Sequence, residues 1–179
     1  MSHSIFYISP SLDKGHYGGS IVAKANLNAI LSNTKLETTY FAVHRNPMEG
    51  AIKVPTTAGR LGTALANLFM LCATLSPKGF FLLLRAIRRK KPDIVWLDSS
   101  LLGILIPLIK IVSRKTKIAC FFHNIESDLV RAYARENFLY WFAYIATITN
   151  EHLSAKYADQ VITIQKLDGE RLKRKYCDT

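Results

Sequence analysis

Five short runs of apolar, aromatic and β-branched residues constrain the fold of this chain more than any other feature of its sequence. They occupy residues 5–9 (IFYIS), 38–43 (TTYFAV), 94–97 (IVWL), 117–122 (KIACFF) and 160–164 (QVITI). The apolar character of these runs is near-continuous rather than alternating, which is typical of strands buried on both faces. A shorter piece at residues 51–54 predicts a further edge strand before Pro55. We therefore expect a mostly parallel sheet with helices on both faces.

Segments with helical periodicity separate the predicted strands. In the first, residues 21, 22, 25, 27, 30 and 31 are apolar at helical spacing, and Ser32 and Asn33 end the pattern. Further helices are predicted over residues 57–75, 78–89, 101–112 and from the loop at 123–126 to about residue 157, before a closing basic helix. Pro77 separates the first two of these, because proline cannot continue a helix. Strands and helices alternate without a linker or repeat, so we expect one α/β domain over residues 1–179, a Rossmann-like doubly wound sheet with right-handed crossovers.

The composition is that of a folded protein in a reducing compartment. Of the 179 residues, 49% are hydrophobic and 21% are charged, which argues against disorder and coiled coil. Cys72, Cys120 and Cys177 lie far apart without a partner at ligand spacing, so neither a zinc site nor a disulfide framework is indicated. The amino terminus lacks the features of a secretory signal, and the apolar stretches at 61–77, 101–109 and 138–149 are too short or too polar to span a membrane. We expect a cytoplasmic protein.

The loop from Asp13 to Ser20, between the first strand and first helix, is the first candidate site. Gly15, Gly18 and Gly19 allow a ligand to approach the backbone, and the helix that follows offers free N–H groups to an anion such as a phosphate. The loop does not match G-x-G-x-x-G, so a dinucleotide fingerprint is absent. The alternative is that the glycines only make a tight turn. Asp13, His16 and Tyr17 in the same loop are candidate acceptor-side residues.

The loop after the run KIACFF is the second candidate site. His123 follows this predicted strand directly, with Asn124, Glu126 and Asp128 close behind. A histidine there could hydrogen-bond a sugar hydroxyl, stabilise developing charge or transfer a proton, because its pKa lies near neutrality. The alternative is a residue that only caps the next helix.

Two further strand ends carry polar residues. Asp98 and Ser99 follow IVWL, and we expect helix capping there in preference to a role in catalysis, with an acceptor-side role as the alternative. His44 and Arg45 follow TTYFAV, and we expect them to be solvated or salt-bridged.

Several enzyme classes are disfavoured. The chain contains no serine nucleophile elbow, no Walker A loop and no H-E-x-x-H motif. His3, His16 and His152 form no evident metal set, and we expect no metal and no bound cofactor.

Four pieces of the chain together resemble a known family. The segments YGGSIVAKANLNAIL, PDIVWLDSSLLG, FFHNIE and YADQVITIQKLDGERLKRKY are similar, in order and spacing, to the N-terminal domain of retaining GT-B glycosyltransferases of family four. The resemblance implies a Rossmann-like acceptor-binding half, with a second Rossmann-like half binding a nucleotide-diphosphate sugar across a cleft. It implies that Gly15, Gly18 and Gly19 lie near the donor phosphates, that His123 faces the transferred sugar, and that Asp159 is structural.

The resemblance also sets what the chain is expected to do. The half that holds the donor in this family has no counterpart in these residues, so we expect a fragment or separately expressed domain that does not transfer sugar alone. The complete enzyme would act in polysaccharide or cell-surface glycan synthesis, on a glycan or lipid-linked acceptor. The alternatives are a stand-alone, non-catalytic binding or partner-subunit module with the same fold, and an unrelated nucleotide-binding Rossmann protein, which the missing fingerprint disfavours.

The chain is strongly basic, with a formal net charge of +11. The cations gather in three clusters: Arg85, Arg88, Arg89, Lys90 and Lys91; Arg114, Lys115 and Lys117; and Lys166, Arg171, Lys173, Arg174 and Lys175. Motifs for RNA or DNA recognition are not evident, so we expect no nucleic-acid partner. The apolar helices at 61–75 and 79–84 precede the first cluster, a pattern that favours peripheral contact with an anionic membrane at its inner face. The alternative is that these helices pack on the sheet or against the second half.

Overall fold

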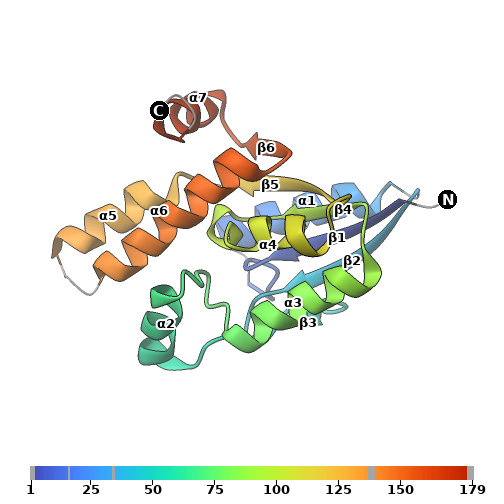
Figure 1. Cartoon of the computed structure of the whole chain (residues 1–179), viewed down its shortest axis with the longest axis horizontal. Helices are drawn as coiled ribbons and strands as arrows, with labels where there is room; N and C mark the ends of the chain where they lie inside the picture. Colours follow the sequence, from blue (N-terminus) through green and yellow to red (C-terminus); the bar gives the residue numbers. More distant parts are fainter. Residues whose placement is uncertain (1–2, 16, 34, 137–139, 177–179) are drawn as a thin grey trace.

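The computed structural model describes residues 3–15, 17–33, 35–136 and 140–176. Within these residues, six strands form one sheet in the order β3-β2-β1-β4-β5-β6, and all neighbouring strands are parallel (Figure 1). The strands are β1 (His3–Ser9), β2 (Leu36–Ala42), β3 (Ile52–Lys53), β4 (Ile94–Leu97), β5 (Lys117–Phe122) and β6 (Gln160–Thr163). The predicted parallel sheet is confirmed, with each expected strand in its place.

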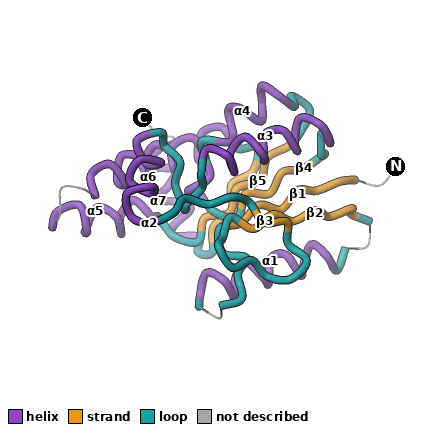
Figure 2. The backbone as a smooth tube through the Cα atoms, turned by 90° about the horizontal axis from the view of Figure 1, so that it is seen from below, coloured by secondary structure: helices purple, strands orange, loops and turns teal. Residues whose placement is uncertain are grey.

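Helices cover both faces of the sheet, so the doubly wound arrangement is also confirmed. They are α1 (Gly18–Leu31), α2 (Gly59–Leu68), α3 (Pro77–Lys90), the 3₁₀ helix η1 (Ser100–Leu102), α4 (Leu105–Val112), α5 (Glu126–Glu136), α6 (Tyr140–Tyr157) and α7 (Lys166–Tyr176). Figure 2 shows α1 on one face and α3 and α4 on the other. Among the helices described, none combines the length and apolarity needed to cross a bilayer.

The larger apolar core fills the space between the sheet and the helices α3 and α4. Ile8, Leu97 and Cys120 are register partners across the three central strands, and all three are fully buried. They pack in one cluster with Leu83 and Ile87 of α3. Complete burial of this row explains why the runs in the sequence carry so few polar residues.

A smaller core lies between the opposite face of the sheet and α1. Tyr7 is fully buried against Ala23 and Leu27 of α1, and its hydroxyl donates to the Ala23 carbonyl at 2.8 Å. The rings of Trp96 and Phe121 continue the row from Tyr7 across β4 and β5, with centroid separations of 6.2 and 6.3 Å. This aromatic row leads to the carboxyl end of β5.

The helix predicted over residues 57–75 is wrong in its second half. α2 ends at Leu68, and the next residues form a loop. Left-handed backbone conformations occur at Met70, Ala73 and Thr74, with φ of 58°, 52° and 58°. The loop folds back so that the Thr57 amide donates to the Thr74 carbonyl at 2.8 Å, while Leu71 and Leu75 enter the core. Burial of these leucines outweighs the helical preference of the segment.

The helix predicted over residues 101–112 is divided into η1 and α4. The amide of Ile104, between them, donates to Asn150 Oδ1 of α6 at 2.8 Å. A Cβ atom added to Gly103 would lie 2.0 Å from the Asn150 carbonyl oxygen, so α6 packs directly on this backbone. This close packing, which no local pattern reveals, interrupts the helix.

The long helix expected after His123 is two helices. α5 and α6 lie side by side (Figure 1), and Glu126, expected in the preceding loop, is the first residue of α5. Asp159, between α6 and β6, accepts hydrogen bonds from the Ile118 amide, at 2.8 Å, and from Lys110. These contacts agree with the structural role that the resemblance implies for Asp159.

The first basic cluster does not adjoin α2. α3 runs from the carboxyl edge of the sheet, beside α2, to the amino edge, where its last turn holds Arg88, Arg89 and Lys90 (Figure 1). There Lys91, Arg114 and Lys115 line a hollow of about 470 Å³. Two basic clusters that are separate in the sequence therefore meet at the amino edge.

Candidate functional site

The strand order reverses between β1 and β4, and polar residues gather at the carboxyl ends of these strands. In parallel sheets, ligands bind in the crevice at this reversal, because the connections on its two sides leave in opposite directions. Ser9 ends β1, Asp98 follows β4, and His123 follows β5. The structure brings these three side chains into contact.

Asp98 is the centre of the cluster. Its carboxylate is fully buried and accepts hydrogen bonds from Ser9 Oγ at 2.8 Å and Asn26 Nδ2 at 3.1 Å. His123 Nε2 lies 3.3 Å from its Oδ2. The helix-capping role expected for Asp98 is therefore wrong: a strand, a helix and the β5 loop all converge on this carboxylate.

Ser99 does have the expected capping role. Its Oγ accepts a hydrogen bond from the Leu101 amide at 3.2 Å, at the start of η1. Ser99 is buried, and its hydroxyl is engaged in this local structure.

His123 is held between Asp98 and the aromatic row. Nε2 also lies 3.0 Å from the Asp98 carbonyl oxygen, and the ring packs edge-on against Phe121 with a centroid separation of 5.0 Å. Burial lowers the pKa of His123, but the hydrogen bond to Asp98 and the charge of Asp98 outweigh it, so the pKa is raised. The side chain is 12% exposed. With Nε2 directed at Asp98, a ligand would meet Nδ1, which can donate a hydrogen bond when the ring is protonated.

Asn124 and Glu126 lie beside His123. Burial raises the pKa of the Glu126 carboxyl group, a hydrogen bond from Asn124 lowers it, and the charges of Glu151 and His123 act in opposite directions, with a net rise. Asn124 is exposed. The predicted loop thus places one exposed amide and one partly buried carboxyl group next to the histidine.

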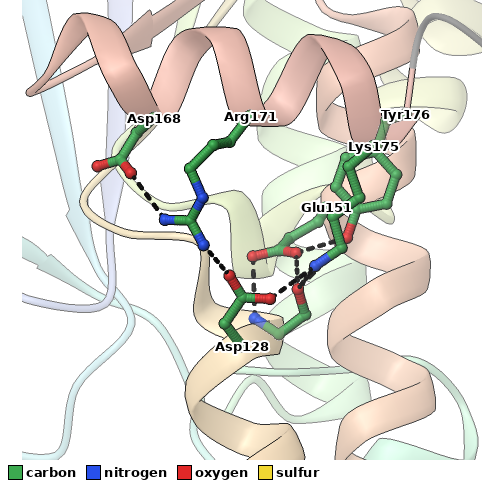
Figure 3. Close-up of polar contacts among 7 residues, drawn as sticks. Asp128, Glu151, Asp168, Arg171, Lys175 and Tyr176 are labelled. Carbon is green, nitrogen blue, oxygen red and sulfur yellow. Dashed lines mark hydrogen bonds and ion pairs between the residues drawn. The ribbon is translucent and has the colours of Figure 1, made fainter.

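A buried carboxylate in α6 fixes the start of α5, and with it the end of the His123 loop (Figure 3). Glu151 is fully buried and accepts from the Ser127 amide at 3.1 Å, from the Ser127 hydroxyl, and from Tyr176 Oη at 2.7 Å. Lys175 of α7 donates to Ser127 Oγ at 2.6 Å and to Asp128 Oδ1 at 3.0 Å. Asp128 belongs to this packing of α7 on α5.

The glycine loop is closed by hydrogen bonds to Gly15. Its amide donates to Asp13 Oδ1 at 2.9 Å, and its carbonyl accepts from Ser20 Oγ at 2.9 Å and Lys24 Nζ at 2.6 Å. Burial raises the pKa of Asp13, but hydrogen bonds from Ser20, Tyr17 and the Gly15 amide outweigh it, and the net pKa is lowered. Asp13 is therefore an anchor of the loop.

Gly15, Gly18 and Gly19 differ in how much space a side chain would have at each position. A Cβ atom on Gly15 would lie 3.1 Å from the Tyr17 ring, so this position is tightly packed, whereas one on Gly19 would lie 3.4 Å from Ser11 Oγ, in ordinary van der Waals contact. Gly18 has no atom within 4 Å of such a Cβ among the described residues. None of these glycines has a positive φ, so backbone conformation does not require them. Gly18 leaves open space at the first turn of α1.

A chain of polar contacts joins the two candidate loops. Ser9 Oγ, which donates to Asp98, also accepts from the Ser11 amide at 3.0 Å. Tyr17 is hydrogen-bonded to Ser11 and to Asp13; burial first, and then Asp13, raises the pKa of its hydroxyl. At the far end, His44 Nε2 lies 3.5 Å from Asp13 Oδ2, so a salt-bridging contact of the kind expected for His44 is present. His16 lies outside the described residues.

Ser9, Asn26 and Lys24 were missed from the sequence. Ser9 carried a usable signal, because it is the polar last residue of a strand that is otherwise buried. Asn26 and Lys24 lie in α1, and no sequence signal pointed to them, because polar residues beside the buried face of a helix are common. In the part of the chain that the structure describes, no group of three or more His, Cys, Asp or Glu side chains could hold a metal ion.

No protein-family model matches the chain, and no curated protein matches it.

Proposed function

We propose that this chain is the acceptor-side half of a retaining GT-B glycosyltransferase of the family-four type, with a nucleotide-diphosphate sugar as donor. The observation that carries the proposal is the pairing of His123 with buried Asp98 at the strand reversal. An imidazole anchored in this way can hydrogen-bond a hydroxyl of the transferred sugar and, when protonated, stabilise charge there. The resemblance in sequence assigns this same role to His123.

The loop from Asp13 to Ser20 supplies the second contact in this proposal. Donor phosphates would approach the first turn of α1, where Gly18 leaves open space and the helix offers backbone N–H groups. Lys24 holds the Gly15 carbonyl, which keeps the loop closed. A second half would bind the nucleotide, and we expect the 179-residue chain alone not to transfer sugar.

The test is turnover in the presence of the donor-binding half, supplied as a further domain or a separate subunit. We expect His123→Ala to lower turnover by about 100-fold or more, the usual contribution of a positioned histidine. The free energy of unfolding should change much less. His3→Ala, which alters an exposed histidine at the amino edge, is the matched control. Unchanged turnover in His123→Ala would refute the assignment of His123, whereas no turnover by the wild type with any donor-binding half would favour a non-catalytic binding or partner-subunit module.

A dinucleotide-binding function is a second candidate, because the strand order is that of dinucleotide-binding domains. Against it stand the loop, which lacks the glycine fingerprint, and the end of β2, where Ala42, Val43 and His44 offer no acidic residue to a ribose. Titration of the isotope-labelled chain with NAD and with nucleotide sugars separates the two. Submicromolar binding of NAD would support the dinucleotide-binding function. Weak chemical-shift changes of Gly15, Gly18 and Gly19 that occur with nucleotide sugars but not with NAD would support the glycosyltransferase half.

We further propose that the protein works in the cytoplasm as a peripheral protein at the inner face of the membrane, where a lipid-linked acceptor would be available. The support is the formal charge of +11 together with large apolar side chains exposed on α2, α5 and α6. Cosedimentation with anionic vesicles at low ionic strength tests this location, because salt screens the attraction.

A further inference from the structure

A hollow of about 470 Å³ opens at the amino edge of the sheet, on the opposite edge from His123 and the glycine loop. It lies between the segment that leads into β4 and the segment that leads from α4 into β5. Three of its lining residues are exposed cations: Lys91, Arg114 and Lys115. We call this site the amino-edge hollow.

Buried hydrogen bonds tie the two segments of the amino-edge hollow together. Thr116 Oγ1 donates to the Pro92 carbonyl at 2.7 Å and lies 2.7 Å from Ser113 Oγ, and all three residues are buried. The Lys117 amide donates to the Asp93 carbonyl at 2.8 Å. The backbone that carries the three cations is therefore held in place, and the cations converge on one hollow.

The positive charge of the amino-edge hollow has no acidic partner. Among the described residues, the three lining cations form no ion pair. Asp93, the carboxylate of the lining, accepts hydrogen bonds from the Ser4 amide at 2.7 Å and from the Ser4 hydroxyl at 3.1 Å. Asp159, at the same edge, is paired with Lys110 and Lys117. The hollow therefore attracts an anion from outside the chain.

The turn between α4 and β5 adds backbone donors to these charges. In the part of the chain that the structure describes, the amides of Arg114 and Lys115 have no acceptor. Successive free N–H groups in a turn form concave sites for anions. A helix dipole favours cations only within the last turn, which accounts for Arg88, Arg89 and Lys90 at the end of α3. It does not account for Arg114 and Lys115, which lie beyond α4.

We infer that the amino-edge hollow binds the diphosphate group of an organic ligand. A diphosphate carries more charge than a single phosphate and can reach cations of both segments at once. The volume is in the range of sites for organic ligands, and Ile111, which is 69% exposed, offers an apolar contact to the rest of such a molecule. A nucleoside diphosphate and an isoprenoid diphosphate share this chemistry. The inference does not rest on the proposed sugar transfer.

The experiment is an NMR titration of the isotope-labelled chain with inorganic pyrophosphate at low salt. We expect saturable shifts of the Arg114 and Lys115 amide signals, and weaker binding of orthophosphate. Arg114→Gln/Lys115→Gln should lower the affinity by about tenfold or more, because charge-assisted hydrogen bonds are lost. Arg131→Gln/Arg135→Gln is the matched control, since it removes the same charge from exposed positions of α5 and should bind like the wild type. Circular dichroism would verify that each variant is folded.

Two esters then identify the source of the ligand. Uridine diphosphate and farnesyl diphosphate are titrated at matched ionic strength, with the amide signals of the same turn as the measure, so that binding at the glycine loop is recognised separately. We expect one ester to bind more tightly than pyrophosphate. If neither does, the organic part of the inference is overturned.

Two further outcomes would overturn the site itself. Equal losses of affinity in the two double variants would mean that pyrophosphate responds only to the net charge of the chain. If pyrophosphate causes no saturable shift, and anionic vesicles sediment the wild type but not Arg114→Gln/Lys115→Gln, this edge is a membrane contact and not a diphosphate site. No arm of the experiment depends on sugar transfer, so its failure leaves the proposed function untouched.

Discussion

At the scale of single residues, Asp98 is the main group that raises the pKa of His123. Burial alone lowers the pKa of His123, and Asp98 reverses this effect. We therefore expect Asp98→Asn to move the pKa of His123 from above its ordinary value of 6.5 to below it. Histidine ring signals in an NMR titration would measure the shift, with His123→Gln to assign the resonance.

Asn26→Ala is the control for this prediction. It removes one hydrogen bond to Asp98 but leaves the carboxylate beside the imidazole, so the pKa of His123 should stay above 6.5. An unchanged pKa in Asp98→Asn would mean that another group holds the proton on His123.

Glu151 is the second buried carboxylate, and its importance is structural. It accepts hydrogen bonds from the Ser127 amide and from Tyr176, so Glu151→Ala would leave buried donors of α5 and α7 without a partner. We expect the free energy of unfolding to fall by about 3 kcal/mol. Urea denaturation measures it. Asp128→Ala, which removes an exposed carboxylate from the same cluster, should cost at most about 1 kcal/mol; equal losses in the two variants would contradict this view of the cluster.

The positions of the candidate site residues could be predicted from the sequence, but the contacts between them could not. His123 and the glycine loop could be predicted because each directly follows an apolar strand in a parallel sheet. The contacts of Asp98 could not, because its partners Ser9 and Asn26 are 89 and 72 residues away in the chain. Only the order of the strands brings them together.

At the scale of elements, the loop after α2 contains backbone strain. Thr74 has a φ of 58°, a conformation that costs a β-branched residue about 1–2 kcal/mol. We expect Thr74→Gly to raise the free energy of unfolding by about 0.5–1 kcal/mol, because relief of strain exceeds the entropy cost of glycine. The measurement is again urea denaturation.

Ala64→Gly is the control for the strained loop. Ala64 lies within α2, where glycine should lower the free energy of unfolding by about 1 kcal/mol. A loss of stability in both variants would show that Thr74 is favoured by contacts that outweigh its backbone strain.

Strands were more predictable than helices for a physical reason. A strand buried on both faces produces a continuous apolar run in the sequence. For this reason the bounds predicted for β4 and β5 are those found in the structure. Helix ends depend on distant contacts: Asn150 interrupts the segment at Ile104, and burial of Leu71 ends α2 early. Local periodicity does not contain this information.

At the scale of the whole molecule, the larger core joins the strained loop to the centre of the sheet. Leu71 and Leu75 of the loop belong to one buried cluster with Ile8, Leu97 and Cys120. A single cluster of this kind favours cooperative unfolding, in which the loop does not open independently. Cooperative unfolding can be tested with two buried thiols, that of Cys72 in the loop and that of Cys120 in β5.

Burial raises the pKa of both thiols to about 12, so neither should react in the folded protein at neutral pH. In a Cys177→Ser background, we expect Cys72 and Cys120 to be alkylated with the same opening free energy, equal to that of global unfolding in urea. Mass spectrometry of peptides after timed alkylation distinguishes the two sites. Faster alkylation of Cys72 would show that the loop after α2 opens while the sheet stays folded. The backbone strain at Thr74 would then be a source of local motion next to α2, and the core could not be treated as one cooperative unit.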